Sequence, residues 1–167
     1  MDNEKQKFLN EFRKSPLTIR VPIKWKDDKE VVLAAVRHHG YALHDASARL
    51  KDDKDIILTA VRFNGSLLSY AFARPRDDKE VVLTAVRQKG HILDYASKRL
   101  QNDKEVVEAA LTSNIKALIY CNFMVLPQIN LSLFTMEQRE RMYLEFSKNS
   151  SEDDIFLLAK TKRHFLS

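Results

Sequence analysis

The chain has 167 residues, of which 44% are hydrophobic and 31% are charged, and this size and balance fit one globular domain with a continuous core. No apolar run reaches the ~20 residues of a membrane-spanning helix, and the N-terminal residues lack the apolar segment of a secretory signal. The single cysteine excludes an internal disulfide framework, so we expect a cytoplasmic protein. The net charge is +5, but 28 basic and 23 acidic residues are interspersed along the chain, which argues against a nucleic-acid-binding tract.

Residues 1–26 are predicted to form an N-terminal helix and cap. A helix over residues 1–14 would place Phe8, Leu9 and Phe12 on one side. The segment that follows contains two prolines and stands where a preceding repeat would otherwise be. Trp25 falls one period before Leu50 of the first repeat, so we expect its side chain to cover that repeat as an apolar lid.

A block with the pattern Asp-Asp-Lys-Glu-Val-Val-Leu-x-Ala-Val-Arg recurs every 25 residues over 27–126 without an insertion. The four repeats are 27–51, 52–76, 77–101 and 102–126. A constant period of this length is typical of a stack of small units, each of which buries its apolar face against its neighbours. Residues that recur in every repeat therefore build the stack, and function is sought where the repeats differ.

The first half of each repeat is predicted to be a capped helix that ends at a glycine. Asp27 stands three residues before Glu30, the spacing of a capping box, and an apolar run follows. The chain has three glycines, and all occupy the slot after this run, at Gly40, Gly65 and Gly90. We expect each glycine to supply the left-handed conformation that ends the helix. Because no glycine remains for a phosphate-binding loop, Walker-type and dinucleotide-binding motifs are excluded.

The second half of the first repeat carries an alanine between two leucines, Leu43, Ala46 and Leu50. The counterparts are Leu68, Ala71 and Pro75 in the second repeat and Leu93, Ala96 and Leu100 in the third. This spacing predicts a second amphipathic helix of about ten residues. Cys121 takes the place of the alanine in the fourth repeat, and we expect its thiol to fill the core. The predicted fold class is therefore all-α, a short α-solenoid of about four helix–Gly turn–helix repeats with atypical helical caps at both ends.

Residues 127–167 are predicted to form a C-terminal helical cap of the same single domain, 1–167. Thr135 and Gln138 have the spacing of a capping box for a helix over 136–148, and a last helix is expected after residue 151. We leave open a homodimer formed through the C-terminal helices. The apolar residues that would support it are Phe156, Phe165 and Leu166.

The pattern Asp-Lys-Glu-Val-Val-Leu-x-Ala-Val-Arg, followed by Gly-x-x-Leu-x-Tyr-Ala-Ser-x-x-Leu in residues 78–100, resembles a bacterial helical-repeat family known as a domain of unknown function. The similarity covers 27–126, and the fourth repeat departs from it at Glu108 and in lacking the turn glycine. Members recur in intracellular pathogens, often among proteins delivered into host cells. The resemblance implies a helical scaffold and adds translocation into a host cell as a second location. It carries over no catalytic residue.

No catalytic, cofactor-binding or metal-binding site is predicted from the sequence. His38 and His44 flank one turn, but a structural zinc site normally has four ligands, and Cys121 lies three repeats away. The acidic residues are accounted for as helix caps. We therefore expect no enzyme activity and no cofactor.

Two series of arginines recur at the same positions of successive repeats. The turn residues are the ones that differ most from one repeat to the next. One interpretation of the arginines is pairing with acids of adjacent repeats, and the other is a groove for an acidic partner. Since aromatic and arginine side chains are favoured anchors of interfaces, we predict a partner-binding surface along the turns. The arginines are Arg37, Arg62 and Arg87, then Arg49, Arg74 and Arg99. The predicted partner-binding residues are Arg37, His38, Tyr41, Arg62, Phe63, Arg87 and His91.

The function predicted from these features is a non-catalytic protein-binding scaffold. Its partner would be another protein with an acidic surface, either a companion bacterial effector or a host protein, which the scaffold would regulate or inhibit by covering its working surface. The alternative is nucleic-acid binding through the arginine series, which would weaken steeply with salt.

Overall fold

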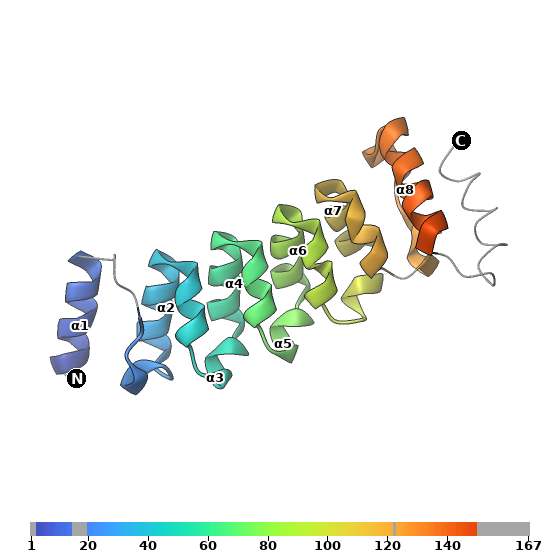
Figure 1. Ribbon diagram of the computed structural model, residues 1–167. Coiled ribbons are helices and arrows are strands. Elements are labelled where there is room, and N and C mark those ends of the chain that lie inside the picture. Colours follow the sequence, from blue (N-terminus) through green and yellow to red (C-terminus); the bar gives the residue numbers. More distant parts are fainter. Residues whose placement is uncertain (1–2, 15–19, 122, 150–167) are drawn as a thin grey trace. The chain divides into compact units, whose positions relative to one another are not determined.

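The computed structural model describes residues 3–14, 20–121 and 123–149, and every regular element in these ranges is helical (Figure 1). The repeated α and 3₁₀ segments make this an all-α solenoid of tandem helical units. The chain forms two compact units, Met1–Ala85 and Val86–Ser167, and their boundary falls inside α6 (Lys79–Gln88). None of the helices in the described ranges combines the length and apolarity that crossing a bilayer requires.

In the first unit, two complete repeats follow an N-terminal helix. Helix α2 packs beside α4, and each is followed by a 3₁₀ helix and a one-turn α-helix (Figure 1). The first repeat contains α2 (Lys29–His38), η2 (Gly40–Asp45) and α3 (Ala48–Lys51). The second contains α4 (Lys54–Phe63), η3 (Gly65–Tyr70) and α5 (Ala73–Arg76).

The prediction of a second helix of about ten residues is wrong. A six-residue 3₁₀ helix and a four-residue α-helix flank an extended pair, Ala46 and Ser47. The helix breaks because Ser47 N–H donates to Lys26 O of the preceding segment, 2.8 Å away, as Phe72 N–H does to Lys51 O at 3.0 Å. The backbone groups at this point are therefore paired between repeats rather than within one helix.

The glycines also have a different role from the one predicted, because none has a positive φ. A Cβ added at Gly65 would lie 2.6 Å from Ala85 O, and one at Gly90 would collide with Ala110 O. A Cβ at Gly40 would instead lie 2.7 Å from Phe63 Cδ1 and 2.8 Å from Leu67 Cδ1. Glycine is thus required by close approach to the following repeat, not by backbone conformation.

The predicted helix caps are displaced by one residue. Asp28 is the N-cap of α2, and its Oδ1 accepts from Glu30 N–H at 3.0 Å and Val31 N–H at 3.1 Å. Asp53 caps α4 in the same way, and Asp103 caps α7 (Lys104–Ser113) through Val106 N–H. Asp27, predicted as the cap, instead accepts a bond from Ser47 Oγ.

The periodic apolar residues do form the core of the repeats. Leu43, Leu68 and Leu93 occupy the same place in successive repeats and are all fully buried. Trp25 is also buried, its ring centroid lies 4.6 Å from that of Phe8, and it belongs to the short helix η1 (Ile23–Trp25). Phe8 lies on α1 (Asn3–Lys14), which confirms a helix in the predicted range.

The second unit continues the repeat and then departs from it. The fourth repeat's helix α7 packs against η4 and η6, and α8 packs against η6. The capping box predicted for α8 is confirmed, because Thr135 N–H donates to Gln138 Oε1 at 2.8 Å and Gln138 N–H to Thr135 Oγ1 at 3.2 Å. The helix predicted after residue 151, with Phe156, Phe165 and Leu166, lies outside the described residues. The remaining elements are η4 (Gly90–Tyr95), η5 (Leu100–Asn102), η6 (Ile115–Tyr120), η7 (Phe123–Gln128), η8 (Leu131–Leu133) and α8 (Met136–Asn149).

Candidate partner-binding site

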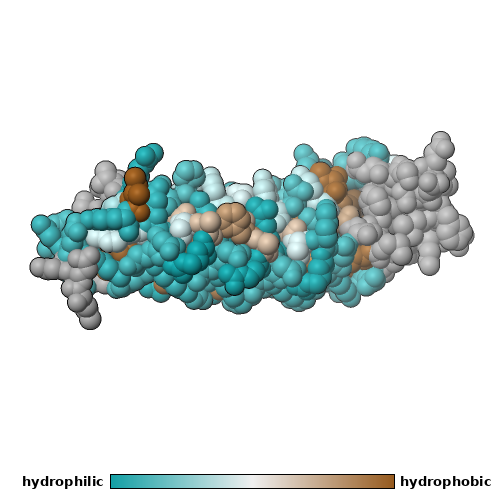
Figure 2. Space-filling view, turned by 90° about the horizontal axis from the view of Figure 1, so that it is seen from below, coloured by the Kyte–Doolittle hydropathy of each residue, from teal (hydrophilic) through white to brown (hydrophobic). Residues whose placement is uncertain are grey.

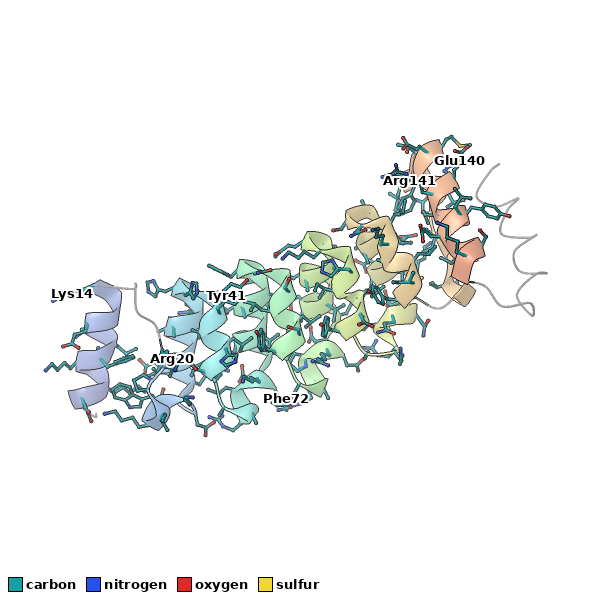
Figure 3. All side chains as sticks on the ribbon, viewed as in Figure 1. Lys14, Arg20, Tyr41, Phe72, Glu140 and Arg141 are labelled. Atoms are coloured by element: carbon teal, nitrogen blue, oxygen red, sulfur yellow. The ribbon has the colours of Figure 1, made fainter. Side chains whose placement is uncertain are left out.

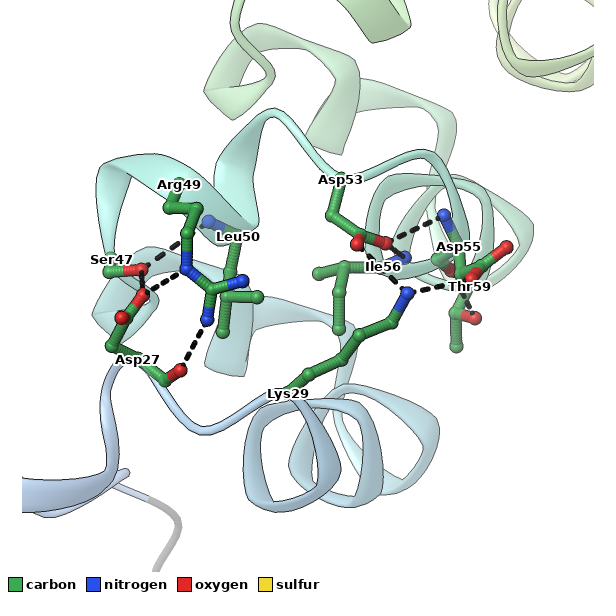
Figure 4. Close-up of polar contacts among 9 residues, drawn as sticks. All are labelled: Asp27, Lys29, Ser47, Arg49, Leu50, Asp53, Asp55, Ile56 and Thr59. Carbon is green, nitrogen blue, oxygen red and sulfur yellow. Dashed lines mark hydrogen bonds and ion pairs between the residues drawn. The ribbon is translucent and has the colours of Figure 1, made fainter.

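The lysines at the start of α2 and α4 each join their helix to the next one. Lys29 Nζ lies 2.8 Å from Asp53 Oδ2 and 2.8 Å from Asp55 Oδ2 (Figure 4). Lys54 makes the same contacts to Asp78 and Glu80 at 2.9 Å. Hydrogen bonds first to the capping aspartate and then to the second acid raise the pKa of both lysines. These lysines are therefore committed to the stack and are poor candidates for binding a partner.

Helix α1 uses the same contact, although its sequence does not follow the repeat. Lys5 Nζ lies 2.7 Å from Asp28 Oδ2 and 2.7 Å from Glu30 Oε2, and Leu9 is buried. The N-terminal helix thus takes the place of a preceding repeat helix and closes that end of the first unit.

Arg49 and Arg74 of the second arginine series serve the stack as well. Arg49 Nε lies 3.0 Å from Asp27 Oδ1, and its Nη2 donates to Asp27 O at 2.6 Å (Figure 4). Arg74 Nε lies 2.5 Å from Asp52 Oδ2. The hydrogen bond from Ser47 and then that from Arg49 lower the pKa of Asp27, and the bond from Arg74 lowers the pKa of Asp52. At Arg49 and Arg74 this favours pairing with acids of adjacent repeats over a groove for an acidic partner.

The series of Arg37, Arg62 and Arg87 is paired at two of its three positions. Arg62 Nη2 lies 3.8 Å from Glu80 Oε1, and Arg87 Nη2 lies 3.8 Å from Glu105 Oε1. The acid at the matching distance from Arg37 is Asp55, whose carboxylate is bound to Lys29. Within the described part of the chain, Arg37 has no carboxylate within ion-pair distance.

Three aromatic rings meet at the exposed turns of the first two repeats. The ring of His39 lies 5.5 Å from that of Tyr41 and 5.6 Å from that of Phe63, and Tyr41 lies 6.3 Å from Phe63 in an edge-on arrangement. Tyr41 is 47% exposed and Phe63 is 50% exposed. We call His39, Tyr41 and Phe63 the turn patch; Tyr41 marks its edge of the first unit in Figure 3.

The turn patch is held in place by the backbone of the first turn. Phe63 Cδ1 and Cβ lie close to Gly40, at 2.7 and 2.9 Å from where a Cβ would be, and Asn64 Nδ2 donates to the Tyr41 hydroxyl at 2.7 Å. Phe63 therefore also has an internal role, since one side of its ring covers Gly40. Its other side is exposed, so the patch presents a rigid aromatic surface, which is typical of interface anchors.

The residues predicted to bind a partner lie in several different environments. His38 is exposed at the end of α2, Arg62 is paired with Glu80, and Tyr41 and Phe63 lie together in the turn patch. Arg87 and His91 belong to the second unit, where Arg87 pairs with Glu105 and His91 is exposed. Five of the seven residues predicted to bind a partner thus lie in the first two repeats, and two lie in the second unit.

Sequence reasoning missed a second exposed aromatic group, at Phe72 and Tyr70. Phe72 is 48% exposed and is the N-cap of α5, where it makes no side-chain capping bond. Ser47 in the same place caps α3 by accepting from Leu50 N–H at 3.3 Å. Tyr70 is 39% exposed and stacks edge-on with His44 at 5.7 Å. The signal was available, because the repeat replaces a capping serine with a phenylalanine that cannot cap.

Phe72 and Tyr41 mark opposite edges of the first unit in Figure 3. In Figure 2, hydrophilic residues cover most of the face shown, and hydrophobic residues occur in small separate spots. On this face the hydrophobic residues are therefore local features of a polar surface rather than parts of one large apolar area.

The described residues offer little to a metal ion or a covalent mechanism. They contain no group of three or more His, Cys, Asp or Glu placed to hold a metal. Cys121 is buried, and burial raises the pKa of its thiol to about 12, so it is a core side chain rather than a nucleophile. A depression of about 420 Å³ on the second unit is bordered by Arg87 and Glu105, which are paired with each other.

Comparison with known proteins identifies the repeats. The family described as Domain of unknown function (DUF4116) matches residues 28–74 and 78–125, and each match spans almost two of the 25-residue repeats. No curated protein and no solved structure matches the chain. Because the two segments make up more than half of the chain and coincide with the helical repeats, the protein belongs to the DUF4116 family.

Proposed function

We propose that this protein is a non-catalytic scaffold that binds another protein through the turn patch. The observation that carries the proposal is the exposed cluster of His39, Tyr41 and Phe63, whose rings lie within 6.3 Å of one another. No other repeat has aromatic residues at both equivalent positions, which hold Ser66 and Gln88 or His91 and Ser113. The other junctions between repeats therefore stack without such a pair of rings, which supports a role of the exposed side of these rings in binding.

The patch has the features of a small interface core. Its rings are fixed by Gly40 and by the hydrogen bond from Asn64, so few rotamers are lost on binding. Arg37 and His38 end the helix from which the patch extends. In this proposal the partner is regulated when the scaffold covers its working surface, and a companion bacterial effector or a host protein is the kind of partner expected.

The experiment compares proteins captured from a lysate of the source cells by wild-type protein and by two matched variants. Tyr41→Ser and Phe63→Ser introduce the residues that the chain itself uses at Ser66 and Ser113, so the repeats should still fold. A partner retained by the wild type and lost by both variants is expected. Phe72→Ser, at the opposite edge, is the control and should retain it.

Two results would contradict the proposal. One is a partner whose capture is unchanged in Tyr41→Ser and Phe63→Ser, because binding would then use another surface. The other is a protein that binds heparin or DNA at low salt with an affinity that falls steeply as salt rises. That second result would support the nucleic-acid alternative, although pairing of Arg49, Arg62, Arg74 and Arg87 with carboxylates argues against it.

A further inference from the structure

The acidic side chain that stands in the position to pair with Arg37, that of Asp55, is shorter than its counterparts in the later repeats. Arg62 and Arg87 each reach a glutamate 18 residues further along the chain, Glu80 and Glu105, at 3.8 Å. The same step from Arg37 leads to Asp55. An aspartate has one carbon–carbon bond fewer than a glutamate, which shortens its reach by about 1.5 Å.

The Asp55 carboxylate is also drawn toward a different cation. Its Oδ2 lies 2.8 Å from Lys29 Nζ. Glu80 shows that a longer side chain can serve both cations at once, because its Oε2 lies 2.9 Å from Lys54 and its Oε1 lies 3.8 Å from Arg62. The aspartate at position 55 therefore leaves the Arg37 guanidinium available where the repeat would otherwise engage it.

The turns next to Arg37 carry little negative charge. Residues 37–45 and 62–70, which form the turns of the first two repeats, include Arg37 and Arg62 and a single acid, Asp45, whose Oδ1 lies 3.9 Å from Lys26 Nζ. Arg37 precedes His39 by two residues, a separation of about 6 Å between Cα atoms. A partner could thus place one side chain on the aromatic rings and a neighbouring one on the guanidinium.

We infer that the partner presents a carboxylate next to an aromatic or large apolar side chain, and that Arg37 binds this carboxylate while the turn patch binds its neighbour. The inference rests on the proposed function, since it gives the chemistry of the partner at the same site. Arginine suits this role because its planar fork can bind both carboxylate oxygens. The aromatic rings supply contact area at low cost in conformational entropy.

The test uses two peptides that differ only in charge, acetyl-Glu-Trp-Glu-Trp-amide and acetyl-Gln-Trp-Gln-Trp-amide. Each is titrated into the isotopically labelled full chain at low ionic strength, and ¹H–¹⁵N spectra report on the amides of His39 to Tyr41 and on Arg37 Nε–H. We expect both peptides to shift the turn-patch signals, with the acidic one binding about three- to fivefold more tightly, as an exposed ion pair allows. The preference should disappear in 0.5 M salt.

The decisive variant is Asp55→Glu, which supplies Arg37 with the internal partner that Arg62 and Arg87 have. The preference for the acidic peptide should fall toward one, and the Arg37 Nε–H signal should move toward those of Arg62 and Arg87. Arg37→Gln should also abolish the preference while leaving the binding of the uncharged peptide unchanged. Arg87→Gln, in the second unit, is the matched control and should keep the preference.

The outcomes separate the inference from the proposed function. Equal binding of both peptides at the turn patch would overturn the inference that the partner presents a carboxylate to Arg37. So would a preference for the acidic peptide that survives Asp55→Glu and Arg37→Gln. In both cases the proposal that the turn patch binds a protein would still stand. Absence of shifts at the turn patch with both peptides would also overturn the inference. The scaffold function would then still be decided separately by the capture experiment with Tyr41→Ser and Phe63→Ser.

Discussion

Lys54 Nζ lies 2.9 Å from Asp78 Oδ2 and joins the first residue of one repeat helix to the N-cap of the next. The same carboxylate group accepts from Val81 N–H at 3.1 Å through its other oxygen. One aspartate therefore both starts its own helix and receives the cation of the helix before it. This double role couples the formation of a helix to its docking against its neighbour, which is how a solenoid gains cooperativity.

The stability of the stack should depend on pH at both ends of the range. Burial raises the pKa of Asp78, but hydrogen bonds from Lys54 and Val81 N–H outweigh it and lower the pKa overall. Its contribution is therefore present above the unfolded value of about 3.9 and is lost as the pH falls through the lower folded value. The pKa of Lys54 is raised, so its contribution is present below about 10.4 and is lost as the pH rises through the higher folded value.

Replacing Lys54 with Met should lower the urea concentration at the unfolding midpoint at pH 7. The decrease of this midpoint between pH 5 and pH 3 should also be smaller than in the wild type, because the Asp78 pKa then returns toward its ordinary value. The measurement is urea unfolding followed by circular dichroism at several pH values. Lys116→Met is the control, since Lys116 has no carboxylate partner among the described residues. An unchanged pH profile in Lys54→Met would show that the contact does not couple the two helices.

Replacing the turn glycines with alanine should destabilise the protein to different extents. Gly65→Ala should lower the free energy of unfolding by about 2 kcal/mol or more, because its methyl group meets the rigid backbone at Ala85 O. Gly40→Ala should cost less, because its nearest neighbours, which include the Phe63 Cβ at 2.9 Å, are side-chain atoms rather than a backbone carbonyl. Equal losses in the two variants, measured by chemical denaturation, would contradict the close-approach explanation.

Phe72 and Pro75 together test why α5 lacks a side-chain cap. Ser47 caps α3 by accepting from Leu50 N–H, and the matching residue of the second repeat is Pro75, which has no N–H to donate. Phe72→Ser and Phe72→Ala should therefore be equally stable, whereas in the background of Pro75→Leu the serine variant should be more stable than the alanine variant by about 1 kcal/mol, the usual value of an N-cap. A gain of this size for Phe72→Ser alone in thermal unfolding would contradict this explanation.

Cys121 should resist thiol reagents while the protein is folded. Its pKa of about 12, compared with the ordinary value of 9.0, lowers the thiolate fraction at pH 8 roughly a thousandfold, and the thiolate is the reactive form. Labelling with a disulfide reagent should therefore be slow in native buffer and fast in concentrated urea. Rapid native labelling at a rate independent of urea would place the thiol at the surface instead of in the core.

Much of the fold could be predicted from the sequence because burial follows the period. Leu43, Leu68 and Leu93 recur every 25 residues and are all fully buried, and the capping box of Thr135 and Gln138 starts α8 as expected. Each of these features depends on residues a few positions apart or on a pattern repeated in the chain. Such local and periodic information is present in the sequence itself.

Other features were decided by contacts between repeats. Gly65 is required by a carbonyl 20 residues away, and Asp27 binds Arg49 instead of capping its own helix. Among the described residues Arg37 has no carboxylate within ion-pair distance, because Asp55 is one methylene shorter than the glutamates that pair with Arg62 and Arg87. In each case the outcome depends on whether atoms from different repeats lie within a few tenths of an ångström of contact. Residue spacing records which side of a helix is buried, but only the packed tertiary structure determines which groups can reach one another.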